Sequence, residues 1–500
     1  MISGAIIQLR SDDKKWKDVG GFDLNDFEQE MVVGVATGGA ILGSILSTCS
    51  NNRFGRRGTI LGASVLFIVG ALVMGLSPTF WVLLVGRFIV GLSVGFASHT
   101  VPIYIAEVSP SDVRGRLVTL NNCSIVIGQV LASVVDCGFG LGNVTQGWRY
   151  MLALGGVPGI ALLVGFIYLP ESPRWLIMHD LKREAQQSLQ LIRDATTFEG
   201  VGKEFQRIES HISENLSDSK DHTISLNLLR RNAPQLFLGC GLQLLQQLCG
   251  INTLMYYSSS ILSSASGTDE DSDPWSSKNN ESICLSAVTA FAQFVGVVIG
   301  LYLVDRVGRR PLTLGSLLAV TISLVAIGFA FFGQKSQTLA LCGMIAYLIS
   351  FGIGMSPIPW LINAEIYPIE IRAFAISLST GVNWTANLIV SSTFLTLAEA
   401  TSTSTTDRKN HPDVAFFIYA SISALGFAWV YAALPETKGR DLEEITRLFR
   451  TRHVGITSEG EYENLSTPDA LGPRYDSIAH AEGKGNRADG GDAGAPLVSQ

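Results

Sequence analysis

The sequence lacks the local patterns that mark common catalytic sites in soluble enzymes. It has no phosphate-binding glycine loop, no zinc-ligand spacing and no nucleophile elbow. Its seven cysteines show no paired spacing, and most fall within apolar segments. We therefore expect them to be small packing residues and not a disulfide framework. These absences argue against a soluble enzyme, a resident metal or an organic cofactor.

Charge is also scarce, because only 16% of the 500 residues are charged whereas 47% are apolar. A membrane-spanning helix needs about 20 predominantly apolar residues. Eleven segments meet this need, and eleven in succession cannot form one soluble core. They lie at about 30–49, 58–78, 80–104, 117–140, 149–169, 234–263, 284–304, 313–333, 337–363, 373–398 and 414–434. The sequence predicts an all-α protein embedded in a lipid bilayer.

The few charges indicate the orientation of these spans. The polar segment 170–232 and the basic loops fall on one side, which we assign to the cytoplasm, and the acidic stretch 268–273 falls on the other. The basic loops are FGRR at 54–57, RGR at 114–116, VGRR at 307–310 and Arg372. The sequons at Asn280 and Asn143 are then candidate external glycosylation sites, or unmodified loop asparagines.

The charged motifs occur twice along the chain. FGRR at 54–57 recurs as VGRR at 307–310, an offset of 253 residues. Glu107 precedes Arg114 by seven residues, as Glu365 precedes Arg372, and PESPR is echoed by PETKGR. Matching charges at the helix ends of two apolar halves are typical of a transporter built from parallel repeats.

Four parts are expected along the chain. They are an amino-terminal membrane half at 1–169, a cytoplasmic helical linker at 170–232, a carboxyl-terminal membrane half at 233–445 and a disordered tail at 446–500. Repeat symmetry requires twelve spans, but Met1–Leu9 is only nine residues long, about 14 Å of helix. The first span is therefore incomplete, and we expect the natural start to lie upstream.

Several longer motifs occur in the order found in the sugar porters of the major facilitator superfamily. They are PIYIAEVSPSDVRGR after span four, PESPRWL after span six, QQLCGINTLMYY in span seven and PETKGR after span twelve. Over residues 1–445 the chain resembles this family, most closely its animal proton-coupled myo-inositol transporters. The resemblance implies a major facilitator fold with two six-helix halves, acting as a monomer.

A polyol site needs neutral hydrogen-bonding side chains and an apolar face at the membrane midplane. Span seven offers such a cluster, followed by Tyr256. The resemblance implies that the sugar site is lined by Gln129, Gln246, Gln247, Asn252, Trp360 and Trp384. Gln293 and Asn383 differ from the family's usual Asn and Gln, and would retune hydroxyl recognition. The alternative is that these side chains only join or pack helices, but we favour binding for the cluster in span seven.

Glu107 and Glu365 are placed to form a cytoplasmic latch with basic residues at helix ends. The expected partners are Arg56, Arg57, Arg114, Arg309, Arg310 and Arg372, with Asp305 beside them. Breaking such modest ion pairs suits alternating access, whereas the alternative is that the arginines only set topology. Asn52 replaces the family's Asp, so we expect a weaker amino-terminal latch. Pro357 and Pro359 interrupt span ten and predict a hinge.

The basis of proton coupling is open. In the family, an Asp in span one faces an Arg in span four; Arg87 matches the Arg, but the Asp would precede Met1. We therefore expect Arg87 to lack that partner and consider two substitutes. Asp136 lies on the same face of span five as Gln129, and His99 has an unperturbed pKa of about 6.5. The alternatives are an Asp of the external vestibule and a hydrogen-bonded bundle His.

These observations predict a secondary transporter that moves a neutral polyol, myo-inositol above all, together with a proton. One alternative is a facilitative hexose carrier, and another is a nutrient sensor that does not transport. We expect the plasma membrane, although the spans do not distinguish it from an endosomal or vacuolar membrane. Nothing in the charge distribution indicates a nucleic-acid partner.

Overall fold

The computed structural model describes residues 2–9, 21–110, 114–142, 146–193, 199–218, 226–266, 277–331, 336–400, 413–438 and 449. Contacts group Met1–Thr446 into one compact unit and Arg447–Gln500 into a second, and only the first is described below. Asn143 and the expected disordered tail at 446–500, apart from Phe449, lie outside the described residues. The described residues are helical and contain no strand, so the expected all-α fold is confirmed.

The described residues of the amino-terminal half form six helices. They are α1 (Ile2–Leu9), α2 (Asp26–Gly75), α3 (Phe80–Val108), α4 (Arg114–Leu141), α5 (Gly147–Leu154) and α6 (Gly156–Tyr168). A capping box starts α2, because Asn25 and Glu28 each accept a hydrogen bond from the other's backbone N–H. The 50 residues of α2 correspond to about 75 Å of helix, enough for two spans. A break at Gly55 separates the two expected spans within it.

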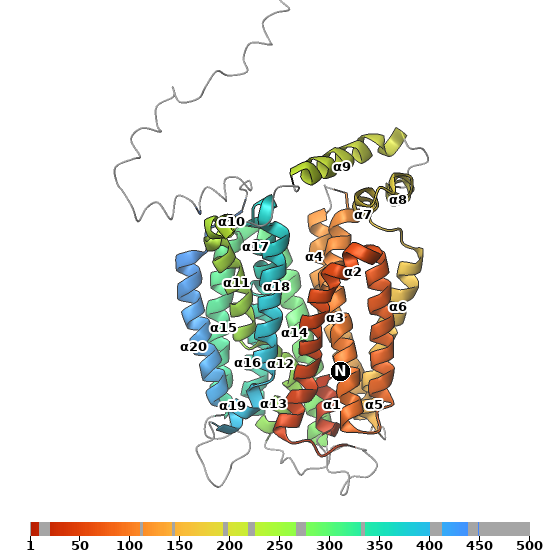
Figure 1. The fold of residues 1–500 in the computed structure, drawn as a ribbon. Helices are drawn as coiled ribbons and strands as arrows, with labels where there is room; N and C mark the ends of the chain where they lie inside the picture. Colours follow the sequence, from red (N-terminus) through yellow and green to blue (C-terminus); the bar gives the residue numbers. More distant parts are fainter. Residues whose placement is uncertain are drawn as a thin grey trace, which may run out of the picture. The chain divides into compact units, whose positions relative to one another are not determined.

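Four short helices follow at one end of the bundle (Figure 1). They are α7 (Pro173–Met178), α8 (Lys182–Arg193), α9 (Glu199–Asp218) and α10 (Leu226–Arg231). The apolar faces of α7, α8 and α9 form a small core of Leu176, Ile177, Ala185, Leu189, Val201 and Phe205. Following the positive-inside rule, this end is called cytoplasmic and the opposite end external.

Spans seven and ten of the carboxyl-terminal half are interrupted. Its helices are α11 (Ala233–Leu248), α12 (Ile251–Tyr256), α13 (Ser258–Ala265), α14 (Ser277–Val307), α15 (Arg309–Phe331), α16 (Gln337–Ile353), α17 (Ile358–Glu365), α18 (Ile369–Ser391), α19 (Phe394–Ala400) and α20 (Asp413–Ala433). Span seven breaks at Gly250, where φ is 85°, and span ten breaks before Ile358. The second break contains Pro357, where proline ends the preceding helix.

The outward surfaces of both halves are apolar. Within the described residues, eight helical segments are long and apolar enough to cross a membrane. Large apolar side chains such as Leu72, Trp81, Leu131 and Leu425 are exposed on them. Such a surface suits contact with lipid, so the protein is a multi-pass membrane protein.

Several pairs of helices join the two halves. The helix α4 packs on α14, α2 packs on α18, and α1 packs on α13. Val126 of α4 and Val297 of α14 lie in one buried cluster. Since α4 leaves the cytoplasmic end and α14 returns to it, the pair is antiparallel. Residues after Val126 therefore lie opposite residues before Val297.

Candidate functional site

A buried amide network joins spans seven, ten and eleven. Asn383 Nδ2 donates to Gln243 Oε1 at 2.7 Å and to Gln246 Oε1 at 2.9 Å. Gln246 Nε2 donates to the backbone carbonyls of Met355 at 2.7 Å and Ser356 at 3.1 Å. Those carbonyls lie in the break of span ten, where the end of α16 leaves carbonyls without intrahelical partners. The proline break and the polar cluster thus belong to one site.

The rest of the span-seven cluster continues this polar surface. Asn252 donates to Gln247 across the break at Gly250. Tyr256, one turn further on, interacts with the side chain of Asn387 on α18. The unwound backbone between α11 and α12 is what brings these side chains to one face.

Several buried polar atoms of this region lack a hydrogen-bond partner among the described residues. They are Gln129 Oε1, Gln243 Nε2, Gln293 Oε1, Trp384 Nε1 and Asn387 Oδ1. Buried polar groups are ordinarily paired, because leaving one unpaired costs about 1–3 kcal/mol. The set contains both donors and acceptors, so a ligand rich in hydroxyl groups would satisfy it.

Gln129 and Gln293 bring both halves of the protein into this region. Gln129 lies three residues beyond Val126 on α4, and Gln293 lies four residues before Val297 on α14. The antiparallel packing of the two helices therefore places them at the same depth. Gln293 also lies where α14 closely approaches α16, since a Cβ on Gly352 would lie 2.8 Å from the Gln293 carbonyl oxygen. The candidate site thus has walls from both halves.

Two residues of the network were not anticipated from the sequence. Gln243 precedes Gln246 by three residues on α11, and Asn387 follows Asn383 by four on α18. Helical spacing was the available signal, because residues three or four apart share a face. Trp360 behaves differently from the rest, because 37% of its surface is exposed.

Arg87 faces the carboxyl-terminal half from α3. Its Nε donates to the Val32 carbonyl at 2.8 Å, and its guanidinium lies within electrostatic reach of Tyr256 and Tyr257. Arg87 is therefore next to the candidate sugar site.

The two other coupling candidates also lie in the amino-terminal half. Asp136 is only 1% exposed and accepts a hydrogen bond from the backbone N–H of Gly4 at 3.2 Å, near the external end of α4. His99 lies toward the cytoplasmic end of α3, 3.5 Å from the Asn51 amide. Asp136 and His99 therefore lie toward opposite ends of the amino-terminal half.

An ion pair joins two helices at the cytoplasmic end of the amino-terminal half. Arg56 Nη2 contacts Glu107 Oε1 at 2.8 Å. The other oxygen of that carboxylate accepts from Ser172 Oγ at 2.5 Å. Helices α2 and α3 and the start of the linker are therefore joined within one half.

The carboxyl-terminal half repeats this arrangement. Arg309 Nη2 contacts Glu365 Oε1 at 3.0 Å, and Thr437 Oγ1 donates to Glu365 Oε2 at 2.6 Å. Asp305 adds a contact at 3.2 Å to Arg309 Nη1. In the amino-terminal half, the residue that corresponds to Asp305 is Asn52. Its backbone carbonyl accepts a hydrogen bond from the Trp175 indole at 3.2 Å.

The glutamates of PESPR and PETKGR were not anticipated as site residues, although their repetition was visible. Glu171 and Glu436 each accept hydrogen bonds from two consecutive backbone N–H groups at 2.9–3.1 Å. The donors are Arg56 and Arg57 for Glu171, and Arg309 and Arg310 for Glu436.

The loops that hold Gly55 and Gly308 require glycine because of their backbone conformation and the carboxylates beside them. Their φ values are 78° and 104°, which L-residues rarely adopt. A Cβ on Gly55 would lie 2.2 Å from Glu171 Oε2, and one on Gly308 would lie 2.7 Å from Glu436 Oε2. The carboxylate occupies the space that a side chain would need.

Glu436 lies outside the membrane spans, and its environment favours the ionised form. Burial alone would raise its pKa. Backbone N–H groups of Lys438, Arg309, Arg310 and Thr437 point at the carboxylate and together hold its pKa below the ordinary value.

The remaining arginines of the expected latch contact backbone carbonyls. Arg57 Nε donates to Phe166 at 2.9 Å, and Arg310 Nη2 donates to Tyr431 at 2.8 Å. Arg372 donates to the Tyr367 carbonyl at 3.1–3.2 Å. The side chain of Arg114 lies outside the described residues.

Polar contacts also join the two halves at the external end. Ser3 Oγ of α1 lies 2.9 Å from Ser258 Oγ and 3.0 Å from Ser259 Oγ. Glu30 of α2 accepts from both the backbone N–H and the hydroxyl of Thr396 on α19. The external ends of the halves are therefore held together in this conformation.

A disulfide links Cys137 of α4 to Cys284 of α14. The expectation that the cysteines are packing residues and not disulfide partners is therefore wrong for these two. The two residues are 147 apart in sequence, and only the packing of α4 on α14 brings them together. Asn280 lies in the same contact and is only 8% exposed, so a glycan there does not fit this closed arrangement.

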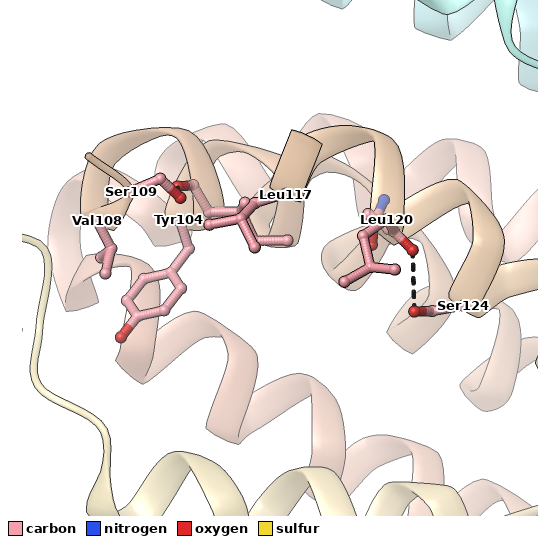
Figure 2. A pocket seen from close by; sticks show the side chains of 8 residues that line it. Tyr104, Val108, Ser109, Leu117, Leu120 and Ser124 are labelled. Carbon is pink, nitrogen blue, oxygen red and sulfur yellow. Dashed lines mark hydrogen bonds between the residues drawn. The ribbon is translucent and has the colours of Figure 1, made fainter. Parts of the chain in front are cut away.

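A pocket of about 270 Å³ lies elsewhere, at the cytoplasmic ends of α3 and α4. Figure 2 shows Tyr104, Val108, Leu117 and Leu120 around it. Its lining is mostly apolar and includes none of the amide network, so we do not assign the sugar site to it.

Comparisons with known proteins agree with this architecture. A family model described as "Sugar (and other) transporter" matches residues 4–449. The chain is 34% identical to the human proton myo-inositol cotransporter, covering 92% of this chain and 81% of that protein. It is 33% identical to the major myo-inositol transporter IolT of Bacillus subtilis, with 88% and 90% covered.

Solved structures of the xylose transporter XylE from E. coli are also similar. The inward open conformation has a TM-score of 0.69 and 25% identity, with 89% of this chain and 97% of that chain covered. The proton:xylose symporter XylE bound to 6-bromo-6-deoxy-D-glucose has a TM-score of 0.68 and 26% identity over the same shares. Two repeated halves, a shared polar site and these matches together place the chain in the sugar transporter family, with the major facilitator fold.

Proposed function

We propose that this protein carries a neutral polyol, myo-inositol, across the plasma membrane by alternating access in symport with a proton. The observation that carries the proposal is the set of buried, unpartnered polar atoms on Gln129, Gln243, Gln293 and Trp384. A ring bearing a hydroxyl on every carbon would supply partners on all sides. The names of the human and bacterial relatives support the choice of inositol and, for the human one, of the proton.

Recognition would combine hydrogen bonding with ring stacking. The amides offer both donors and acceptors to hydroxyl groups. Trp384, beside Asn383, would place an aromatic surface against ring CH groups while its Nε1 donates. The site contains no charged side chain in its amide network, which suits a neutral substrate.

The two halves would move around this fixed site, so that it opens to the cytoplasm and then closes again. The external contacts of Ser3, Glu30 and the disulfide hold one side closed. The paired networks at Glu107 and Glu365 would stiffen the cytoplasmic ends of each half, so that the halves move as units.

A facilitative hexose carrier is the second candidate, because a solved neighbour binds a glucose analogue. Uptake of labelled myo-inositol and glucose at external pH 5.5 and 7.5, by cells expressing this chain, separates the two. Inositol uptake that rises in acid supports the symporter, whereas glucose uptake that ignores pH supports the carrier. The Asp136→Asn variant then asks whether the buried carboxylate is needed for the pH effect.

A further inference from the structure

The disulfide between Cys137 and Cys284 crosses the boundary between the two halves. Cys137 lies near the external end of α4, and Cys284 lies in the first turns of α14. Cys137 lies eight residues beyond Gln129, and Cys284 lies nine residues before Gln293. The bond lies about 12 Å from the candidate site along either helix. The bond is therefore at the external mouth of the proposed substrate pathway.

Its geometry limits how far the external ends can separate. The two Cα atoms are 4.5 Å apart, and a disulfide tolerates at most about 6.8 Å. Only about 2 Å of separation is therefore available while the bond exists. Alternating access requires the halves to rock against each other and open the site to the outside.

Close packing around the bond adds to this restriction. A Cβ on Gly140 would lie 3.5 Å from Ile283 and 3.6 Å from Asn280. On the neighbouring turn, Asp136 packs against α1. The external ends of α4, α14 and α1 thus pack together, and the disulfide is the covalent link between α4 and α14.

We propose that Cys137 and Cys284 form a redox modification site that locks the external side closed when oxidised and permits outward opening when reduced. The proposal rests on the proposed transport function. Two molecules of a small thiol would reduce the bond: one thiolate attacks a sulfur to give a mixed disulfide, and the second releases it. The products are two protein thiols and one small-molecule disulfide, with two electrons passing to the protein.

The test compares inositol uptake before and after treatment of cells with tris(2-carboxyethyl)phosphine, which reduces the disulfide and becomes the phosphine oxide. Uptake by the untreated protein is expected to rise severalfold on reduction. The Cys137→Ser variant should transport at the raised rate without treatment and respond no further. Cys342→Ser, which removes an exposed free cysteine, is the matched control and should behave like the unmodified protein.

A second readout does not depend on the substrate. Ser392 lies between the halves, because a Cβ on Gly34 of α2 would lie 2.2 Å from its Oγ. In a Ser392→Cys reporter, peptide-level mass spectrometry measures labelling by an impermeant maleimide. Labelling is expected to rise severalfold on reduction and equally in the Cys137→Ser background.

The outcomes separate the lock from the transport function. Raised labelling without uptake of any substrate would keep the lock and overturn the proposed function. Unchanged labelling and uptake after verified reduction would overturn the lock and make the bond a structural staple about which the halves pivot. Free thiols at both positions in the untreated protein would overturn it as well.

Discussion

Glu30 and Thr396 join the two halves through one carboxylate. Thr396 donates its backbone N–H to Glu30 Oε1 at 2.9 Å and its hydroxyl to Glu30 Oε2 at 2.6 Å. Glu30 is only 2% exposed, and the residues are 366 apart in sequence. The contact is therefore a buried polar link between the external ends of the two halves.

Glu30→Gln is expected to weaken that closure. The amide loses the charge and one acceptor, and hydrogen bonds to charged groups contribute about 1.5–3 kcal/mol. The outward-open population should rise by about tenfold or more. Labelling of the Ser392→Cys reporter measures it, in a Cys137→Ser background so that the disulfide does not mask the change.

Glu28→Gln is the matched control for Glu30→Gln. Glu28 lies two residues before Glu30, in the first turn of α2, and its carboxylate accepts from Asn25 N in the capping box. Glutamine also serves at that position, so labelling should stay unchanged. Equal labelling of the Glu30→Gln variant and its parent would contradict the role given to Glu30.

Asn383→Ala is expected to impair substrate binding. The change removes the donor that orients the side chains of Gln243 and Gln246, and each of the two hydrogen bonds lost contributes about 0.5–1.5 kcal/mol to holding the site in its binding geometry. The KM for inositol uptake should rise by about tenfold or more. Thr385→Val, on the exposed face of the same helix, should leave KM unchanged, and a similar effect of both variants would argue against a site at Asn383.

Gly308→Ala is expected to destabilise the protein, whereas Gly315→Ala is not. Gly308 has a φ of 104° and faces Glu436, so alanine should cost about 1–3 kcal/mol. Gly315 is helical with open space beside it, where alanine is neutral or stabilising. Thermal unfolding in detergent compares the two; equal melting temperatures would contradict the strain argument.

Stability should depend on Glu436 in acid. Its folded pKa is lowered from an ordinary value of 4.5, so its contribution is present above pH 4.5 and is lost as pH falls through the folded value. Glu436→Gln removes this contribution. The melting temperature of the unmodified protein should therefore fall more steeply below about pH 4.5 than that of the variant. Parallel profiles would show that the carboxylate is not stabilised by its backbone donors.

Much of the architecture followed from periodicity and repetition. Apolar runs predicted the helices, because a lipid environment permits few alternatives to them. The repeated GRR motifs predicted matching loops, and Gly55 and Gly308 adopt left-handed conformations in both. The break before Ile358 was visible as well, since proline cannot continue a helix.

The contacts between distant segments were not accessible in the same way. Nothing local to Cys137 indicates Cys284 as its partner, and nothing near Glu30 indicates Thr396. In the amide network, too, a residue could be recognised from the sequence although its contact could not. Gln246 was recognisable from its motif, whereas its bond to Asn383 depends on how α11 packs on α18.

By itself, the sequence determined the helical membrane fold, its duplication and the family. These properties depend on composition, short-range spacing and ordered motifs, which are encoded locally. Only the tertiary structure decided which helix faces meet, which buried amides remain unpaired and which residues close the external side. Those depend on the register of antiparallel helices, where a shift of one residue turns a side chain by about 100°.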